Sequence, residues 1–115
     1  MLILPIKKKW YDMIISGEKR EEYREVKNYW QTRIMGELSF EDKTKFENWK
    51  PVKIENVYIR NGYGNDKPTA KISAIVHYKC GHPEWGAEEG KKYYVFEILD
   101  VQELTNLMRS KPLVR

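Results

Sequence analysis

The half of the chain after Pro51 constrains the fold most, because it holds three stretches of residues that favour β-strands. In the first two stretches apolar and polar residues alternate, and the third is dense in aromatic and β-branched residues. Two links that contain glycine separate the stretches, and the second link is too long and too decorated for a plain hairpin turn. The predicted strands span 52–60, 69–79 and 91–99, with links at 61–68 and 80–90.

The start of the chain predicts one more strand, followed by a helix. Residues 2–6 are apolar, and Pro5 confines them to an edge or terminal strand because proline has no N–H to donate to a neighbour. Between Lys8 and Ser16 the apolar residues recur at helical spacing, and Gly17 follows as a natural C-terminal cap. The sequence therefore predicts a strand and an amphipathic helix within the first seventeen residues.

The middle of the chain is predicted to be partly helical. Aromatic and aliphatic residues at 29–34 indicate a short second helix, and the polar segment at 36–50 is interpreted as a helical or looped insertion. Near the other end, Leu104, Leu107 and Met108 recur at helical spacing, so the segment 100–115 is predicted to be a short helix or a frayed tail. The predicted anchors of the insertion are Phe40, Phe46 and Trp49.

The length of 115 residues fits one domain, because soluble domains cluster near ~100–150 residues. We therefore expect a single domain over 1–115, with an insertion around 36–50. Hydrophobic residues make up 41% of the chain, and no apolar run approaches the ~18–20 residues that span a bilayer. In the opening MLILPIKKK the charges follow the apolar stretch. Neither a membrane span nor a signal peptide is expected.

A single cysteine, Cys80, cannot form an internal disulfide, which fits a reducing cytoplasm. The shortest metal-binding pattern, Cys80-Gly-His82, offers two ligands where a structural zinc needs about four. We therefore expect a cytoplasmic protein without a metal or other cofactor. The net charge is +4, and the segment 7–33 holds eight Lys and Arg against five acidic residues, which favours a polyanionic partner.

The densest charged run extends from Ser16 to Arg24, directly behind the helix-ending glycine. If this run faces a core, its charges must be paired or hydrogen-bonded, and in a cleft such groups can act as base, acid or anion clamp. The alternative is an edge strand with solvated charges that discourage aggregation, in which each surface ion pair is worth ~0–1 kcal/mol. Spacing alone favours this second interpretation.

The residues Gly17, Lys19, Glu22 and Arg24, directly after an amphipathic helix, resemble the signature of the ASCH domain, a family of the PUA-like superfamily. The opening LPIKKKWYDMIISGEK and the segments RNGYG and EWGAEEG also resemble those of small bacterial and phage ASCH proteins. The resemblance covers most of the chain. It implies an α+β fold, a PUA-like small mixed β-barrel of about five or six strands flanked by two or three helices.

The resemblance also implies a cleft into which the motif residues point, with RNA or a modified nucleoside as the ligand. In such a cleft Lys19 and Arg24 would hold a phosphate or polarise a carbonyl, and Glu22 would orient them or accept hydrogen bonds from a base. On an ideal strand Lys19 faces away from Glu22 and Arg24. A turn or bulge just after Gly17 is therefore needed to gather the three side chains.

A bacterial branch of the family hydrolyses acetylcytidine with a motif lysine, a threonine three residues later and a distant glutamate. Lys19 matches the lysine, Glu22 stands in place of the threonine, and Glu84 and Glu97 are candidates for the glutamate. The alternative function is therefore an amidohydrolase, with Lys19 stabilising an oxyanion and Glu22 as general base. A ribonuclease, and a regulatory module that binds a peptide or small metabolite in the same cleft, are further alternatives.

Aromatic residues interleaved with basic ones give a second indication of nucleic acid, because aromatic faces stack bases while basic side chains follow the backbone. The best stacking candidates are the aromatic residues of the glycine-rich links, Tyr63 and Trp85. Aromatic residues at periodic apolar positions are instead predicted to pack in the core; these are Trp10, Trp30 and Tyr58. The predicted ligand contacts are Lys19, Glu22, Arg24, Arg60, Asn61, Tyr63 and Trp85.

Overall fold

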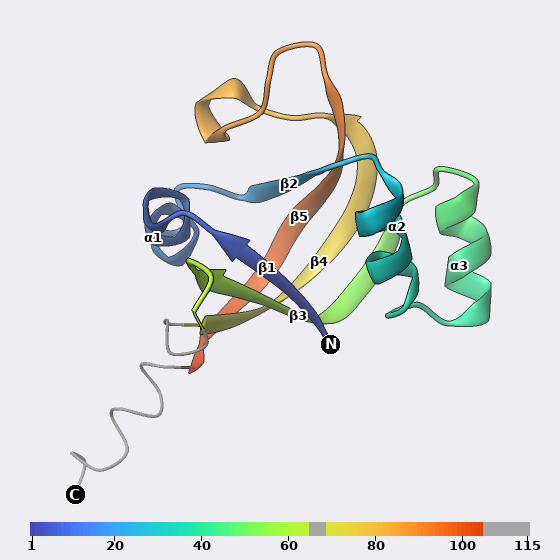
Figure 1. The fold of residues 1–115 in the computed structure, drawn as a ribbon, viewed down its shortest axis with the longest axis horizontal. Helices are drawn as coiled ribbons and strands as arrows, with labels where there is room; N and C mark the ends of the chain where they lie inside the picture. The colour runs from blue at the N-terminus through green and yellow to red at the C-terminus, as the bar shows by residue number, and fades with distance from the viewer. Residues whose placement is uncertain (65–68, 105–115) are drawn as a thin grey trace, which may run out of the picture.

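The computed structural model describes residues 1–64 and 69–104, which form an α+β fold (Figure 1). Within these residues one five-stranded mixed sheet is accompanied by three α-helices and a short 3₁₀ turn, η1. The predicted fold class, strand number and helix number are confirmed. The strands are β1 (Leu2–Ile6), β2 (Glu21–Glu25), β3 (Val52–Asn61), β4 (Thr69–Cys80) and β5 (Lys92–Glu103). The helical elements are α1 (Lys8–Ser16), α2 (Asn28–Met35), α3 (Phe40–Glu47) and η1 (Pro83–Trp85).

The sheet has the strand order β1-β3-β4-β5-β2, so that β1 and β2 are its two edges. Strand β1 runs parallel to β3, whereas the other neighbouring pairs are antiparallel. The sheet curls into a half-barrel, and both edge strands cross in front of the long strands β4 and β5 (Figure 1). Curling therefore brings together two edges that are separated by three strands within the sheet.

The predictions for the N-terminal half are confirmed. The strand that contains Pro5 is an edge strand, as the missing N–H requires. Helix α1 has the predicted bounds and buries Tyr11 and Ile14 on one face. Gly17 caps it in the left-handed conformation, with φ 88°. The second predicted helix is α2, which buries Ile34.

The insertion at 36–50 forms α3, and its aromatic residues behave differently from one another. Phe46 is a core anchor, with 7% of its surface exposed. The same prediction is wrong for Phe40 and Trp49, which are 87% and 55% exposed. Phe40 precedes Phe46 by six residues and so lies about 120° away from it around the helix. Trp49 lies beyond the end of α3.

A bulge in β3 explains an irregularity in its sequence pattern. The buried residues Ile54 and Val57 are three positions apart, which on an ideal strand would place them on opposite faces. The register with β4 shifts between these two residues, and Asn56 takes a left-handed conformation there, with φ 62°. The extra residue turns Val57 back toward the core.

The curled sheet carries apolar cores on both faces. The larger core is covered by side chains from α1, α2 and α3, and the smaller one lies under the link between β4 and β5, which contributes Ala87. Because side chains alternate along β5, this strand contributes to both cores. Tyr94 and Phe96 belong to the larger core, and Tyr93 and Val95 belong to the smaller one. The link therefore folds onto the sheet.

Gly81→Ala, at the start of this link, is expected to lower the free energy of unfolding by about 1–3 kcal/mol. A Cβ at position 81 would overlap the ring of Tyr23 and lie 2.8 Å from the Cβ of Ala87. The ring cannot easily move aside, because its hydroxyl donates to Glu21 and accepts from the main-chain N–H of His82. Chemical denaturation of the variant and the wild type measures the difference.

Gly36→Ala is the matched control for this substitution. Gly36 has a helical backbone, and the nearest atoms to an added Cβ are 3.5 Å away. The control should leave the free energy of unfolding unchanged or raise it by up to ~1 kcal/mol, because alanine restricts the unfolded chain more than glycine does. If Gly81→Ala were as stable as the wild type, the link would not pack closely on Tyr23.

The C-terminal prediction can be compared only in part. Strand β5 continues to Glu103, beyond the predicted end at residue 99. The short helix or frayed tail predicted for 100–115 is wrong for residues 100–103, which belong to β5, and residues 105–115 lie outside the described residues. In the part of the chain that the structure describes, no helix combines the length and the apolarity needed to cross a membrane.

Candidate ligand cleft

A cleft of about 580 Å³ lies between the two edge strands of the half-barrel. Strands β1 and β2 supply opposite walls, and side chains from the starts of α1 and α2 and from the end of β3 complete it. The charged side chains of β2 therefore border this cleft and also contact the rest of the protein. The lining residues are Ile3, Pro5, Ile6, Lys7, Trp10, Glu22, Tyr23, Arg24, Glu25, Tyr29, Trp30, Arg60, Tyr63 and Tyr93.

The turn predicted after Gly17 is present and sets the direction of Lys19. The N–H of Lys19 donates to the carbonyl of Met13 over 2.9 Å, which closes the end of α1. Strand β2 begins only at Glu21, so Lys19 precedes the strand and does not follow its alternation. Its side chain enters the interior and is 1% exposed.

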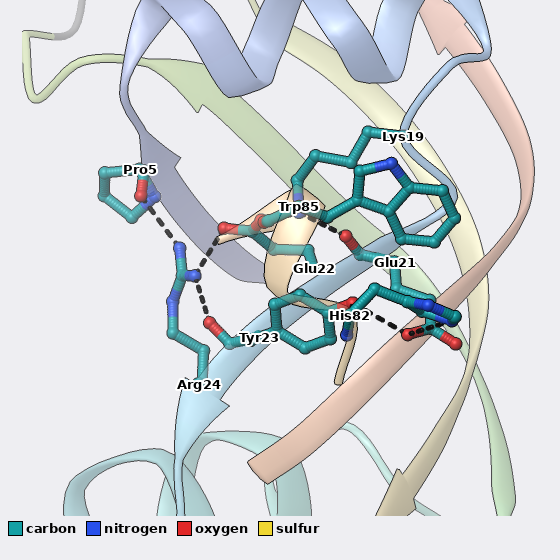
Figure 2. Close-up of polar contacts among 8 residues, drawn as sticks. All are labelled: Pro5, Lys19, Glu21, Glu22, Tyr23, Arg24, His82 and Trp85. Carbon is teal, nitrogen blue, oxygen red and sulfur yellow. Dashed lines mark hydrogen bonds and ion pairs between the residues drawn. The ribbon is translucent and has the colours of Figure 1, made fainter. Parts of the chain in front are cut away.

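The ammonium group of Lys19 has three oxygen acceptors (Figure 2). It donates to the main-chain carbonyl of Glu21, donates to that of Trp85 over 2.9 Å, and lies 3.2 Å from a carboxylate oxygen of Glu22. The ring centres of Trp10 and Tyr23 lie 5.3 and 4.7 Å from Nζ. Burial lowers the pKa of Lys19, and the Glu22 carboxylate opposes that shift. Lys19 thereby joins α1, β2 and the β4–β5 link.

Glu22 and Arg24 form a second ion pair on the floor of the cleft. The other carboxylate oxygen of Glu22 lies 2.5 Å from Nη1 of Arg24. The guanidinium also donates to the carbonyls of Tyr23, at 2.7 Å, and Pro5, at 2.8 Å (Figure 2). Trp30 covers it at 5.0 Å from the ring centre. Arg24 therefore bridges the two edge strands.

The other buried carboxylate of the run, Glu21, faces the β4–β5 link. Its oxygens pair with Lys79 at 3.1 Å and accept from the Tyr23 hydroxyl at 2.8 Å. Burial raises the pKa of Tyr23, a shift that the His82 N–H opposes and the Glu21 carboxylate reinforces. The edge-strand interpretation is thus right about the edge. It is wrong about solvation for Lys19, Glu21 and Glu22, which are buried, and right for Glu18 and Arg20, which are exposed. The link and α1 cover what would otherwise be an exposed edge.

The remaining predicted contacts divide into two groups. Arg60 and Tyr63 line the cleft, and Tyr63 is 85% exposed. Asn61 pairs with Ile6 at the end of β3 and does not line it. The ring of Trp85 packs on His82, 4.6 Å between centres, outside the cleft lining. Trp85 contributes its carbonyl to Lys19 instead.

The candidate distant glutamates lie apart from the Lys19–Glu22 pair. Glu97 is 2.7 Å from a ring nitrogen of His77, and Glu84 is an exposed side chain 3.8 Å from His82. Among the described residues, neither makes an ion pair with Lys19 or Glu22, although Glu97 is the register partner of Glu21.

Sequence reasoning missed ten of the fourteen lining residues, among them Pro5, Trp30 and Tyr93. The Pro5 carbonyl carries no sequence signal, because every residue has one. Trp30 does pack against the core as predicted, but it also covers Arg24. Tyr93, assigned only to a strand, lines the cleft. The sequence signal that was available for Trp30 is its position among the aromatic residues at the start of a predicted helix, a few residues after a basic residue.

The cleft therefore offers two carboxylates, two guanidinium groups and several aromatic faces. Across residues 1–64 and 69–104, no three His, Cys, Asp or Glu side chains are grouped so that they could hold a metal ion. Comparison with known proteins finds no family model, no curated protein and no solved structure that matches this chain.

Proposed function

We propose that the cleft binds one nucleotide of a single-stranded RNA, or a modified nucleoside, as the resemblance to ASCH domains implies. The observation that carries the proposal is the buried carboxylate of Glu22, held between Lys19 and Arg24 in a cleft with aromatic walls. Lys19 lies behind Glu22 and does not itself line the cleft. The charged side chains of the lining are three basic and two acidic, and this net positive charge suits a ligand that carries both N–H donors and phosphate oxygens.

Glu22 is the group that would read the base. A carboxylate has about four acceptor positions, and among the described residues Lys19 and Arg24 occupy two of those of Glu22. The others can accept N–H groups from the edge of a base. Tyr63 is the most exposed aromatic residue of the lining and supplies a face for stacking.

Basic residues at the cleft would hold the backbone of the ligand. Arg24 carries five N–H donors, and three are directed at protein oxygens. Lys7 also lines the cleft and is exposed. A polynucleotide bound in this way releases counterions, so its affinity should fall as salt rises, with a slope of ~0.7 per phosphate contact.

Tyr63→Ala is expected to weaken the binding of a labelled twelve-nucleotide RNA by about 1–3 kcal/mol, or roughly 5- to 150-fold in Kd. The residue is exposed, so stability should not change. Fluorescence anisotropy over a salt series measures both affinity and slope. Phe40→Ala removes an equally exposed aromatic ring outside the cleft lining and should bind as the wild type does. If the affinity for the RNA did not depend on salt and neither substitution changed it, the proposal would be contradicted.

Hydrolysis of an acylated nucleoside is the second candidate function. The position of Glu22 favours it, because this carboxylate is buried beside Lys19 and also lines the cleft. Glu22 would take a proton from water as the water attacks the acyl carbonyl, and would pass that proton to the nitrogen as the C–N bond breaks, which yields a carboxylic acid and the free amine. Lys19 already has three acceptors for its three N–H groups, so it would position Glu22. Incubation with acetylcytidine tests this candidate by chromatography, and absence of cytidine would discard it.

A further inference from the structure

We propose that Trp49 and Tyr78 form a second base-stacking station, so that the ligand is an extended RNA strand that reaches beyond the cleft. The proposal rests on the proposed function and adds the size class of the ligand. Neither residue lines the cleft. The two rings are in contact, with centres 4.3 Å apart, and both are partly open to solvent.

The backbone of Trp49 is unusual for so large a residue. It follows the last turn of α3 with φ 63°, in the left-handed conformation that glycine usually supplies at this point. Its N–H donates to Phe46 and that of Lys50 donates to Lys45, both over 3.0 Å, which is the normal pattern of a helix end closed by glycine. An indole here is strained, and more than half of it is exposed. Core packing therefore does not explain it.

The outer face of this aromatic pair suits a nucleobase. The hollow beneath it holds about 10 Å³, too little for more than a water molecule, so a ligand must lie on top. Lys50 borders the hollow, and Nζ of Lys92 is 5.2 Å from the ring centre of Tyr78. Exposed aromatic rings beside lysines are the elements by which proteins stack bases and follow a phosphate backbone.

The sheet register connects this station with the cleft. Tyr78 pairs with Tyr94, and Tyr94 pairs with Arg24, so the three lie in one row across β4, β5 and β2. Neighbouring strands are about 4.8 Å apart, which places the backbones of Tyr78 and Arg24 roughly 10 Å from each other. Tyr94 itself is buried under Phe46, so a bound strand would pass over the surface outside this row. The separation of the two ends is within reach of one strand, since comparable sites take ~4–16 nucleotides.

Each of the two stations has a lysine beside an aromatic ring. Lys91 lies 5.3 Å above the ring of Tyr93, which lines the cleft, and Lys92 lies above Tyr78. The two lysines lie on opposite faces of the sheet, because Tyr93 belongs to the smaller core and Tyr78 is the register partner of Tyr94 in the larger one. Lys91 also pairs with Glu25 at 3.2 Å, so Lys92 is the cation that would hold a phosphate beside the Trp49–Tyr78 pair. An uncharged apolar partner would gain nothing from this arrangement.

Trp49→Gly tests the proposal without removing a core residue, because glycine adopts the left-handed conformation freely. With the labelled twelve-nucleotide RNA, the variant should bind roughly 5- to 150-fold more weakly than the wild type. Trp49→Phe keeps an aromatic face and should retain most of the affinity. Thermal unfolding, run in parallel, shows whether each variant is folded. Cytidine monophosphate, which is too small to reach Trp49, should bind wild type and Trp49→Gly equally.

The outcomes separate this proposal from the function of the cleft. If Tyr63→Ala weakens RNA binding and Trp49→Gly does not, the second station is overturned and the cleft proposal stands. Equal losses for the RNA and for cytidine monophosphate would also overturn it, because the effect would then act through the cleft. If the wild type binds neither probe, both proposals fail, and the aromatic pair serves a partner other than RNA.

Discussion

Lys19→Met is expected to lower the free energy of unfolding by about 3–5 kcal/mol, the usual effect of removing one partner from a buried ion pair. Methionine has a similar length but donates no hydrogen bond. The substitution leaves the carbonyl of Trp85 without its donor and the buried carboxylate of Glu22 with Arg24 alone. Relief of the desolvation of Lys19 offsets part of this loss. Urea denaturation of the wild type and the variant measures the difference.

Two further variants make this result interpretable. Lys8→Met is the same substitution in an exposed i,i+4 pair with Asp12 and should cost only about 0.2–0.5 kcal/mol. Lys19→Met combined with Glu22→Met removes both charges and should be less destabilised than the sum of the single variants. A loss below about 1 kcal/mol for Lys19→Met would mean that the Lys19 contacts do not hold α1, β2 and the link together.

The local parts of this architecture could be predicted because neighbouring residues determine them. Pro5 placed its strand at an edge, and the apolar spacing before Gly17 gave α1 its bounds. The direction of the Lys19 side chain was also predictable, since a turn or bulge after Gly17 is needed to bring it to Glu22. Each of these predictions depends on a steric or hydrogen-bonding property of one short segment.

Of the parts that failed, one depends on contacts between distant segments and another on alternation within a single strand. The charges of β2 resembled a solvated edge because nothing within β2 reveals that Trp85 and Ala87 of a later link fold back over it. Arg60 and Asn61 were both assigned to the ligand, yet adjacent residues of a strand point to opposite faces. Only Arg60 of the two lines the cleft, which strict use of the alternation would have anticipated.

Arg24→Ala is expected to lower the free energy of unfolding by about 3–5 kcal/mol, and also to loosen β1. The guanidinium donates to Glu22, to the carbonyl of Tyr23 and, across the gap in the half-barrel, to that of Pro5. Without it the carboxylate of Glu22 keeps Lys19 as its charged partner, and the two sheet edges lose their bridge. Denaturation measures the first effect, and faster hydrogen exchange of the β1 amides measures the second.

Arg24→Lys and Arg33→Ala show whether the geometry or the charge of the bridge matters. Lysine keeps the charge but is a single point donor, which cannot span Glu22 and Pro5 as the planar fork does, so it should recover only part of the stability. Arg33 also lies over an aromatic ring, 3.5 Å from the ring centre of Tyr29, but it is exposed, and its removal should cost less than about 1 kcal/mol. Full recovery by lysine would show that charge alone suffices, whereas unchanged β1 exchange in Arg24→Ala would show that the bridge does not hold the edges. With the bridge intact, Glu22 stays at a fixed depth in the cleft, as recognition of one base edge requires.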